Sequence, residues 1–323
     1  MNSINREIFE KHQVRKTKKQ KTLFRKYLTE SLTSLGYKTK VEKGSLGSKN
    51  LIVGDPETAK VVFTAHYDTC PVLPFPNFNT PTSIPIYILY QIILTALLLI
   101  PSVLLCIFAE LALYALSTPD AELHLSSDIV FIILYLGLIG TLYLMLFGPA
   151  NKHTANDNTS GVTTLIDIMV NMDPAVRDNA AFIFFDNEEI GLIGSSSYAK
   201  AHPAVRNEKL VINFDCVSDG NYMLFALRRG AVKHEKLIKE AFSSGDGIVS
   251  KVCDRGVFYP SDQHNFSCGV GVAALRRSRI CGVLYLSRIH TRRDTVYKEE
   301  NISYITNRSI ALINILAASD NDL

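Results

Sequence analysis

The chain has 323 residues, of which 47% are hydrophobic and 20% are charged, with a formal net charge of +3. The high apolar fraction and the small net charge exclude a disordered chain. The charge is also too small to indicate a nucleic-acid partner. The six cysteines are scattered and form no CxxC pair, which argues against a disulfide scaffold and against a thiolate zinc module.

The N-terminal region, residues 1–43, is strongly basic, with twelve Lys and Arg against four Glu. Apolar residues from Leu23 to Leu35 recur at helical spacing, which predicts an amphipathic helix with a basic face. A solvated helix face is the simpler interpretation, and attraction to an anionic membrane surface is the alternative. No apolar segment follows the first basic residues, so we expect no secretory signal peptide.

Two short apolar strands follow a Gly-rich turn, over residues 51–53 and 61–65. The second is continuously apolar, which is typical of a parallel strand covered on both faces. It ends in the sequence HYDT, residues 66–69.

Two long apolar segments interrupt this pattern. Residues 84–116 contain Glu110 as their one charged residue, and residues 129–147 contain none. Each is long enough to span a bilayer as a helix. We therefore predict an inserted transmembrane helical hairpin, residues 84–148, with the lipid bilayer as its partner.

The orientation of this hairpin follows from the basic residues that flank it. The N-terminal region and Lys152 lie on its two sides, whereas residues 117–128 between the helices contain no Lys or Arg. The positive-inside rule then predicts an integral membrane protein with two spans, whose N-terminus and hydrophilic domain are cytoplasmic. The alternative to a transmembrane hairpin is an apolar helical cap that is buried in a homo-oligomer. The polar residues Gln91 and Glu110 within the first apolar segment keep this alternative open.

Strands and helices alternate again from residue 149 onward. Helices are predicted over 161–172, 191–201, 233–242 and 302–318, and strands over 180–185, 209–214, 222–227, 270–275 and 282–286. This alternation predicts an α/β fold with three layers, a mixed and mainly parallel central sheet with flanking helices. Residues 44–83 and 149–323 then form one domain, into which the hairpin is inserted.

Acidic residues and histidines stand at the predicted carboxyl ends of the strands, where ligands bind in open α/β sheets. They are His66, Asp68, Asp157, Glu188, Glu189, Asp215 and, near the C-terminus, His290. Imidazole and carboxylate ligands without a thiolate suit zinc, manganese or cobalt in a catalytic site.

The segments HYDT, TANDNTSG, FDNEEIGLIGS, NFD and RIHTRRDT resemble those of the M28 peptidases, the aminopeptidase group with two catalytic zinc ions. The resemblance covers roughly residues 50–75 and 150–320, in the family's order, and leaves out the apolar hairpin. It implies two Zn²⁺ per chain, or other divalent metals. His66 and Asp215 would hold one ion, Glu189 and His290 the other, and Asp157 would bridge both.

The same resemblance implies that Glu188 is the general base and that Asp68 hydrogen-bonds to His66, which fixes the imidazole tautomer. A tyrosine that stabilises the oxyanion is expected too, and Tyr259 and Tyr285 are both candidates. Gln263 stands where the family usually has His in the segment YPSDQH, residues 259–264.

These roles predict a membrane-embedded aminopeptidase that removes N-terminal residues from short peptides. A glutaminyl cyclase with a single zinc ion is the first alternative, although such enzymes usually line their pocket with tryptophan and this chain has none. A non-enzymatic membrane module of the same fold is the second alternative, and a carboxypeptidase is the third. In a carboxypeptidase, Arg276, Arg277, Arg292 and Arg293 would bind the substrate carboxylate.

Overall fold

The computed structural model describes residues 1–73, 75, 77–118 and 123–318. The chain forms two compact units. The sheet unit comprises Met1–Ile84 and Ala150–Leu323, and the helical unit comprises Pro85–Pro149. Asp120 and Glu122, which we assigned to the connection between the apolar helices, lie outside the described residues.

The sheet unit contains one sheet, whose strands run in the order β1-β2-β4-β3-β5-β8-β6-β7, with β9 paired to β8. The four central strands, β4, β3, β5 and β8, are parallel, and antiparallel pairs flank them on both sides. This arrangement confirms the predicted mixed sheet with a parallel centre. The bounds are β1 (Thr39–Lys43), β2 (Lys49–Val53), β3 (Val61–His66), β4 (Ala180–Phe185), β5 (Leu210–Phe214), β6 (Tyr222–Leu227), β7 (Val249–Cys253), β8 (Gly269–Arg277) and β9 (Leu284–Tyr285).

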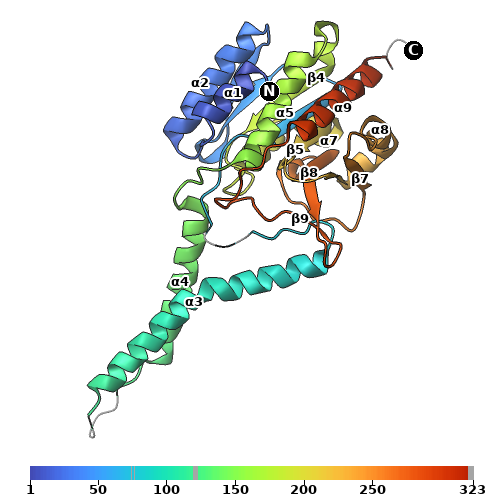
Figure 1. Ribbon diagram of the computed structural model, residues 1–323. Coiled ribbons are helices and arrows are strands. Elements are labelled where there is room, and N and C mark those ends of the chain that lie inside the picture. The colour runs from blue at the N-terminus through green and yellow to red at the C-terminus, as the bar shows by residue number, and fades with distance from the viewer. Residues whose placement is uncertain (74, 76, 119–122, 319–323) are drawn as a thin grey trace. The chain divides into compact units, whose positions relative to one another are not determined.

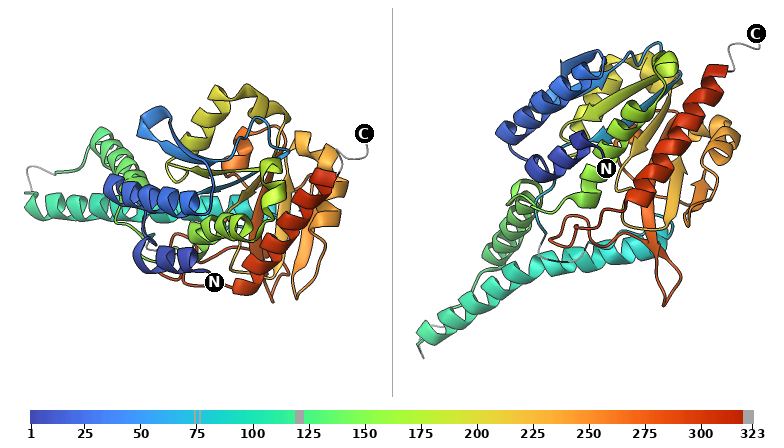
Figure 2. Two further views of the ribbon diagram at one scale, coloured as in Figure 1. Left: turned by 90° about the horizontal axis from the view of Figure 1, so that it is seen from above. Right: turned by 45° about the horizontal axis from the view of Figure 1, so that its top comes forward.

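Helices cover both faces of this sheet (Figures 1 and 2). On β3, Phe63 faces a core shared with Leu28 and Ile305, whereas its neighbour Val62 faces a core shared with Tyr198. Successive strand residues point to opposite faces, so a continuously apolar strand contributes to both cores. The helices are α1 (Ser3–Lys11), α2 (Lys18–Ser34), α5 (Gly161–Asn171), α6 (Ile193–Ala201), α7 (Pro203–Glu208), α8 (Glu235–Ala241) and α9 (Glu299–Ala318).

The N-terminal region differs from its prediction in its elements and in the direction of its charge. The amphipathic helix is present as α2, but α1 and the edge strand β1 were missed, and part of the basic charge points inward. Arg15 and Arg25 are buried, and Lys21 forms an ion pair of 2.7 Å with Asp186. These three cations therefore stabilise the sheet unit, and the remaining basic residues of α2 are mainly exposed.

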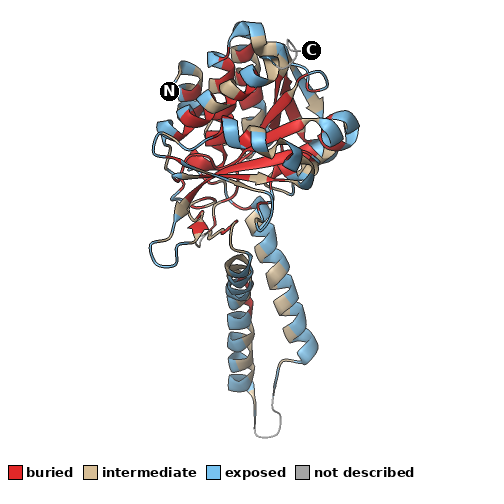
Figure 3. Cartoon of the chain, turned by 90° about the vertical axis from the view of Figure 1, so that its right-hand side faces the viewer, coloured by how far each residue is buried: buried red, intermediate tan, exposed pale blue. Residues whose placement is uncertain are grey.

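The helical unit consists of α3 (Ile84–Leu116) and α4 (Ser127–Phe147). Both helices are long and apolar enough to cross a membrane, and most of their side chains are exposed (Figure 3). The carboxylate of Glu110 is 2.6 Å from Nδ1 of His124 and accepts a hydrogen bond from the backbone of Leu125. Gly137 faces Ser102 so closely that a Cβ atom there would overlap the Ser102 hydroxyl. Small residues at such a crossing allow two apolar helices to approach each other.

Candidate active site

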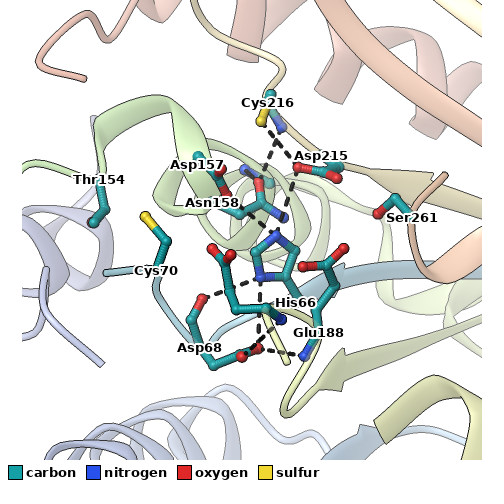
Figure 4. A network of polar contacts seen from close by, with 12 residues as sticks. His66, Asp68, Cys70, Thr154, Asp157, Asn158, Glu188, Asp215, Cys216 and Ser261 are labelled. Atoms are coloured by element: carbon teal, nitrogen blue, oxygen red, sulfur yellow. Dashed lines mark hydrogen bonds and ion pairs between the residues drawn. The ribbon is translucent and has the colours of Figure 1, made fainter. Parts of the chain in front are cut away.

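Most of the predicted ligands lie at the carboxyl edge of the parallel strands, because they end a strand or shortly follow one, whereas Asp157 lies in the loop before α5. His66 ends β3, and Asp215 directly follows β5. Glu188 and Glu189 follow β4, which pairs with β3 in parallel. Figure 4 shows His66 surrounded by the carboxylates that these segments supply.

A first group of possible metal ligands consists of His66, Asp157 and Asp215. Nε2 of His66 lies 3.4 Å from Oδ1 of Asp157 and 3.6 Å from Oδ1 of Asp215. All three side chains are buried. Two carboxylates and one imidazole that converge in this way form a donor set suited to zinc.

A second group consists of Asp157, Glu189, His290 and the thiol of Cys70. Nε2 of His290 lies 2.9 Å from Oδ2 of Asp157 and 3.4 Å from Oε2 of Glu189. Asp157 therefore belongs to both groups and offers a different oxygen to each histidine. Cys70 was missed by the sequence analysis, although it directly follows the HYDT segment.

The loop that carries Asp157, residues 155–160, is held against the segment after β5 by hydrogen bonds to its asparagine side chains. Asn156 accepts hydrogen bonds through Oδ1 from the backbone of residues 218 and 219, and Asn158 accepts one from residue 216. Asp294 accepts hydrogen bonds from the backbone amides of Asn156 and Asp157, at 2.8 and 2.9 Å. The asparagines of TANDNTSG thus hold the loop while Asp157 faces the two ligand groups.

Asp68 contacts both His66 and the turn that carries Glu188 and Glu189. Its backbone carbonyl accepts a hydrogen bond of 3.1 Å from Nδ1 of His66, and its carboxylate lies 3.6 Å from that nitrogen. The carboxylate accepts hydrogen bonds from the backbone amides of Glu188 and Glu189, at 3.0 and 3.2 Å. Asp68 therefore orients the histidine mainly through its carbonyl and holds the turn that carries the two glutamates.

Burial and crowding of charge perturb the ionisation of the site. Burial raises the pKa of Glu188 well above its usual range and raises that of Glu189 to about 8. Burial also disfavours ionised Asp157, but the imidazoles of His290 and His66 outweigh it and lower its pKa. For His290, burial is outweighed by Glu189 and Asp157, which raise its pKa to about 9. The ligand groups contain four carboxylates and two imidazoles, so the two glutamates hold protons that a bound cation would displace.

These residues fit a bound metal ion. Oε1 of Glu189 is buried and has no hydrogen-bond partner among the described residues, although buried polar atoms are normally paired. A divalent cation would satisfy this oxygen and would stabilise the ionised form of the carboxylates in both groups. Imidazole and carboxylate donors are also ligands that zinc accepts.

The two candidate tyrosines differ in their surroundings. Tyr259 is nearly buried and donates a hydrogen bond of 3.0 Å to the backbone carbonyl of Asp215. Tyr285 lies in β9, and its ring packs against that of Phe78 in a tilted arrangement, with the ring centres 5.1 Å apart. Gln263 donates a hydrogen bond to the carbonyl of Tyr259 and belongs to neither ligand group. The structure thus brings Tyr259 to the site.

Sequence reasoning also missed a buried cation behind the site. Arg15 is 0% exposed and donates hydrogen bonds to the carbonyl of Tyr67 and to the hydroxyl of Thr159. Tyr67 lies next to His66, and Thr159 lies two residues after Asp157. Arg15 therefore links two of the three segments that supply the first ligand group.

Solved structures of related fold cover nearly the whole chain. A Zn-dependent exopeptidase from Parabacteroides distasonis is 16% identical, with a TM-score of 0.57 over 96% of this chain and 94% of that one. The LapA aminopeptidase of Legionella pneumophila is 13% identical, with a TM-score of 0.54 over 97% and 70%. A glutaminyl cyclase from Porphyromonas gingivalis is 15% identical, with a TM-score of 0.54 over 97% and 96%.

These similarities establish the fold, since all three identities are low. A search of curated proteins finds no match to the chain. The sequence model of "Peptidase family M28" matches residues 141–315, which include every proposed ligand except His66 and the thiol of Cys70. Because this match spans more than half of the sequence, the chain belongs to peptidase family M28.

Proposed function

We propose that the chain is an aminopeptidase that uses two zinc ions to hydrolyse the first peptide bond of short peptides. The observation that carries this proposal is the position of Asp157, which offers one oxygen to each of two buried ligand groups. A carboxylate in this position is suited to bridge two metal ions, as in enzymes that hydrolyse peptides with a metal pair.

The proposed roles follow the two groups. His66, Asp157 and Asp215 would hold one ion, and Asp157, Glu189 and His290 would hold the other. When bound, such ions polarise the substrate carbonyl and lower the pKa of water.

Glu188 is the proposed general base. Its carboxylate shares a third group with His66 and Glu189, and its backbone is held by Asp68. It would take the proton of the attacking water and pass it to the leaving amine. Tyr259 is the proposed oxyanion donor, because its hydroxyl lies beside Asp215.

Metal analysis of the purified chain, combined with a substrate panel, tests this function. We expect two zinc ions per chain and hydrolysis of peptides with a free N-terminus. The same peptides with an acetylated N-terminus should be spared. One zinc ion, together with pyroglutamate formation from N-terminal glutamine, would support the cyclase alternative and contradict the aminopeptidase proposal.

We also propose that α3 and α4 cross a bilayer, with the N-terminus and the sheet unit in the cytoplasm. The support is the length and apolar composition of both helices and the basic residues of the two flanks. Single accessible cysteines at Ser127 and Lys200, both exposed, test the orientation in a background in which Cys106, Cys253 and Cys281 are replaced by serine. An impermeant thiol reagent should label only the cysteine at Ser127 in intact cells, and both after permeabilisation. Labelling of Lys200→Cys in intact cells would reverse the orientation, and release of the chain by alkaline washing would exclude the spans.

A further inference from the structure

The β8–β9 tip, residues 276–282, extends beyond the carboxyl edge of the sheet. Val272 of β8 is level with Phe214, the last residue of β5, and β8 continues five residues farther to Arg277. At about 3.3 Å per residue, β8 extends past the end of β5 by roughly 16 Å. On its other side β8 pairs with β6 as far as Leu275, and beyond that residue Arg276 and Arg277 pair with the short strand β9.

The β8–β9 tip is strongly basic. It carries Arg276, Arg277 and Arg279 and contains no acidic residue. Together with Lys298, these arginines line a hollow of about 580 Å³ next to the first residues of β6. Among the described residues, no carboxylate forms an ion pair with any of the four cations. The hollow therefore favours an anion, and a phosphate group accepts several guanidinium hydrogen bonds at once.

An apolar side chain stands at the end of this basic strand pair. Ile280 is 99% exposed, although isoleucine is among the residues most often buried. A cluster of arginines around one projecting apolar side chain is typical of surfaces that contact lipid headgroups, where charge attracts the anionic surface and the apolar group enters it.

The β8–β9 tip also lies at the edge from which the chain runs to the apolar helices. Asn79, shortly before α3, forms a bridge with Leu286, the residue after β9. Ala150, shortly after α4, forms a bridge with Pro71 in the segment that follows β3. Both connections to the helical unit therefore leave the sheet unit at the carboxyl edge, the edge that carries the tip.

We propose that the β8–β9 tip binds the phosphate headgroups of anionic phospholipids in the leaflet that adjoins the sheet unit, with Ile280 among the headgroups. The proposal rests on the proposed function in one respect, the anchoring of the chain in a bilayer by α3 and α4. A soluble phosphate compound offers the same chemistry, but the exposed Ile280 favours a lipid surface.

The experiment uses the full chain in nanodiscs, with an environment-sensitive fluorophore on Cys281, which is exposed beside Ile280. Cys106 and Cys253 are replaced by serine so that the label is specific. In discs that contain phosphatidylglycerol, the emission should shift to the blue and should be quenched by lipids labelled at the headgroup. Discs of pure phosphatidylcholine should give neither change, and added salt should weaken both. Each arginine contributes about fivefold to the ratio of bound to free tip.

The test variant is Arg276→Gln with Arg277→Gln and Arg279→Gln, which should lose the response to phosphatidylglycerol. The matched control is Arg229→Gln with Lys233→Gln and Arg255→Gln, which removes the same charge. These three exposed residues lie after the carboxyl ends of β6 and β7, at the opposite edge because β6 runs antiparallel to β8. The control should respond as the original chain does.

Several results would overturn the assignment. An unchanged response in the test variant, or no response of the original chain to phosphatidylglycerol, excludes lipid binding by the tip. An equal response to inorganic phosphate in phosphatidylcholine discs makes the hollow a site for soluble anions. We expect the test variant to keep full peptidase activity in detergent. A rise in KM limited to peptides with a free C-terminal carboxylate would instead assign the arginines to the substrate. Failure of the proposed peptidase function is distinguishable from failure of lipid binding, because it would appear as missing peptidase activity in the original chain.

Discussion

Replacing Arg15 by Met should destabilise the sheet unit and weaken metal binding together. The guanidinium is fully buried and lies 5.2 Å from the centre of the Phe24 ring. It donates hydrogen bonds to the carbonyl of Tyr67 and to the hydroxyl of Thr159, and also to two carbonyls of its own segment. Burial lowers its pKa to about 10, so the side chain remains charged at neutral pH.

The expected cost follows from the acceptors that the substitution leaves behind. The two hydrogen bonds to Tyr67 and Thr159 are buried, and each buried acceptor left without a donor costs about 1–3 kcal/mol. Methionine fills part of the volume and removes a buried charge, which offsets some of this loss. We therefore expect the free energy of unfolding to fall by about 3 kcal/mol, and the affinity for zinc to fall with it. The second effect arises because the two acceptors adjoin the segments of His66 and Asp157.

Urea titration of the full chain in detergent, followed by circular dichroism, measures the first quantity, and competition with a zinc chelator measures the second. Lys19→Met, at an exposed position of α2, is the matched control and should change the free energy of unfolding by less than about 0.5 kcal/mol. Arg15→Lys keeps the charge and loses the planar guanidinium. Its free energy of unfolding should therefore lie between those of Arg15→Met and Lys19→Met. A loss below about 1 kcal/mol for Arg15→Met, with unchanged zinc affinity, would refute this reasoning.

Four further substitutions test the site and its surroundings. Glu188→Gln should lower kcat about 10²–10⁴-fold with zinc content unchanged, whereas Glu240→Gln on the surface should leave kcat unchanged; comparable kcat values in the two variants would exclude Glu188 as the base. Asp157→Asn should reduce the occupancy of both zinc ions, and His290→Ala should reduce mainly one, as read by mass spectrometry of the intact protein; equal losses would contradict the bridging role. Burial raises the pKa of the half-buried Asp167 to about 6, so its ionisation destabilises the fold as the pH rises from about 4 through 6. Asp167→Asn should therefore raise the free energy of unfolding by about 1 kcal/mol at pH 8, with solvent screening included, and should leave it unchanged at pH 4.

Much of this molecule could be predicted from local sequence patterns. The continuously apolar segment 180–185 marks a strand covered on both faces, and the structure has β4 there. Because parallel strands end at one edge, the strand pattern alone places residues as distant as His66 and Asp215 together. The edge strand β7 was missed, because its exposed residues from Val249 to Cys253 lack the apolar pattern of a buried strand.

Features that depend on packing between distant segments could not be predicted. Arg15 stands in a basic run that also contains the exposed Lys18, Lys19 and Lys26, and no local pattern shows that its own side chain turns inward. No other cysteine lies near Cys70 in the sequence to mark it as a metal ligand. Its place in the second ligand group depends on the path of the chain after β3. The choice between Tyr259 and Tyr285 likewise depends on long-range packing, which brings only Tyr259 beside Asp215.

The insertion of the two apolar helices between Asp68 and Asp157 has a consequence for biosynthesis. A ribosome adds about 5–20 residues per second, so Asp157 is polymerised several seconds after Asp68, and both apolar helices are translated in the interval. His66 therefore lacks its neighbouring ligands until both apolar helices have been synthesised, and His290 is synthesised later still. The nascent chain holds an incomplete set of ligands throughout this time. For the proposed metal site, metallation would thus be a late event in the maturation of the chain, and a delay in inserting the apolar helices would postpone it directly.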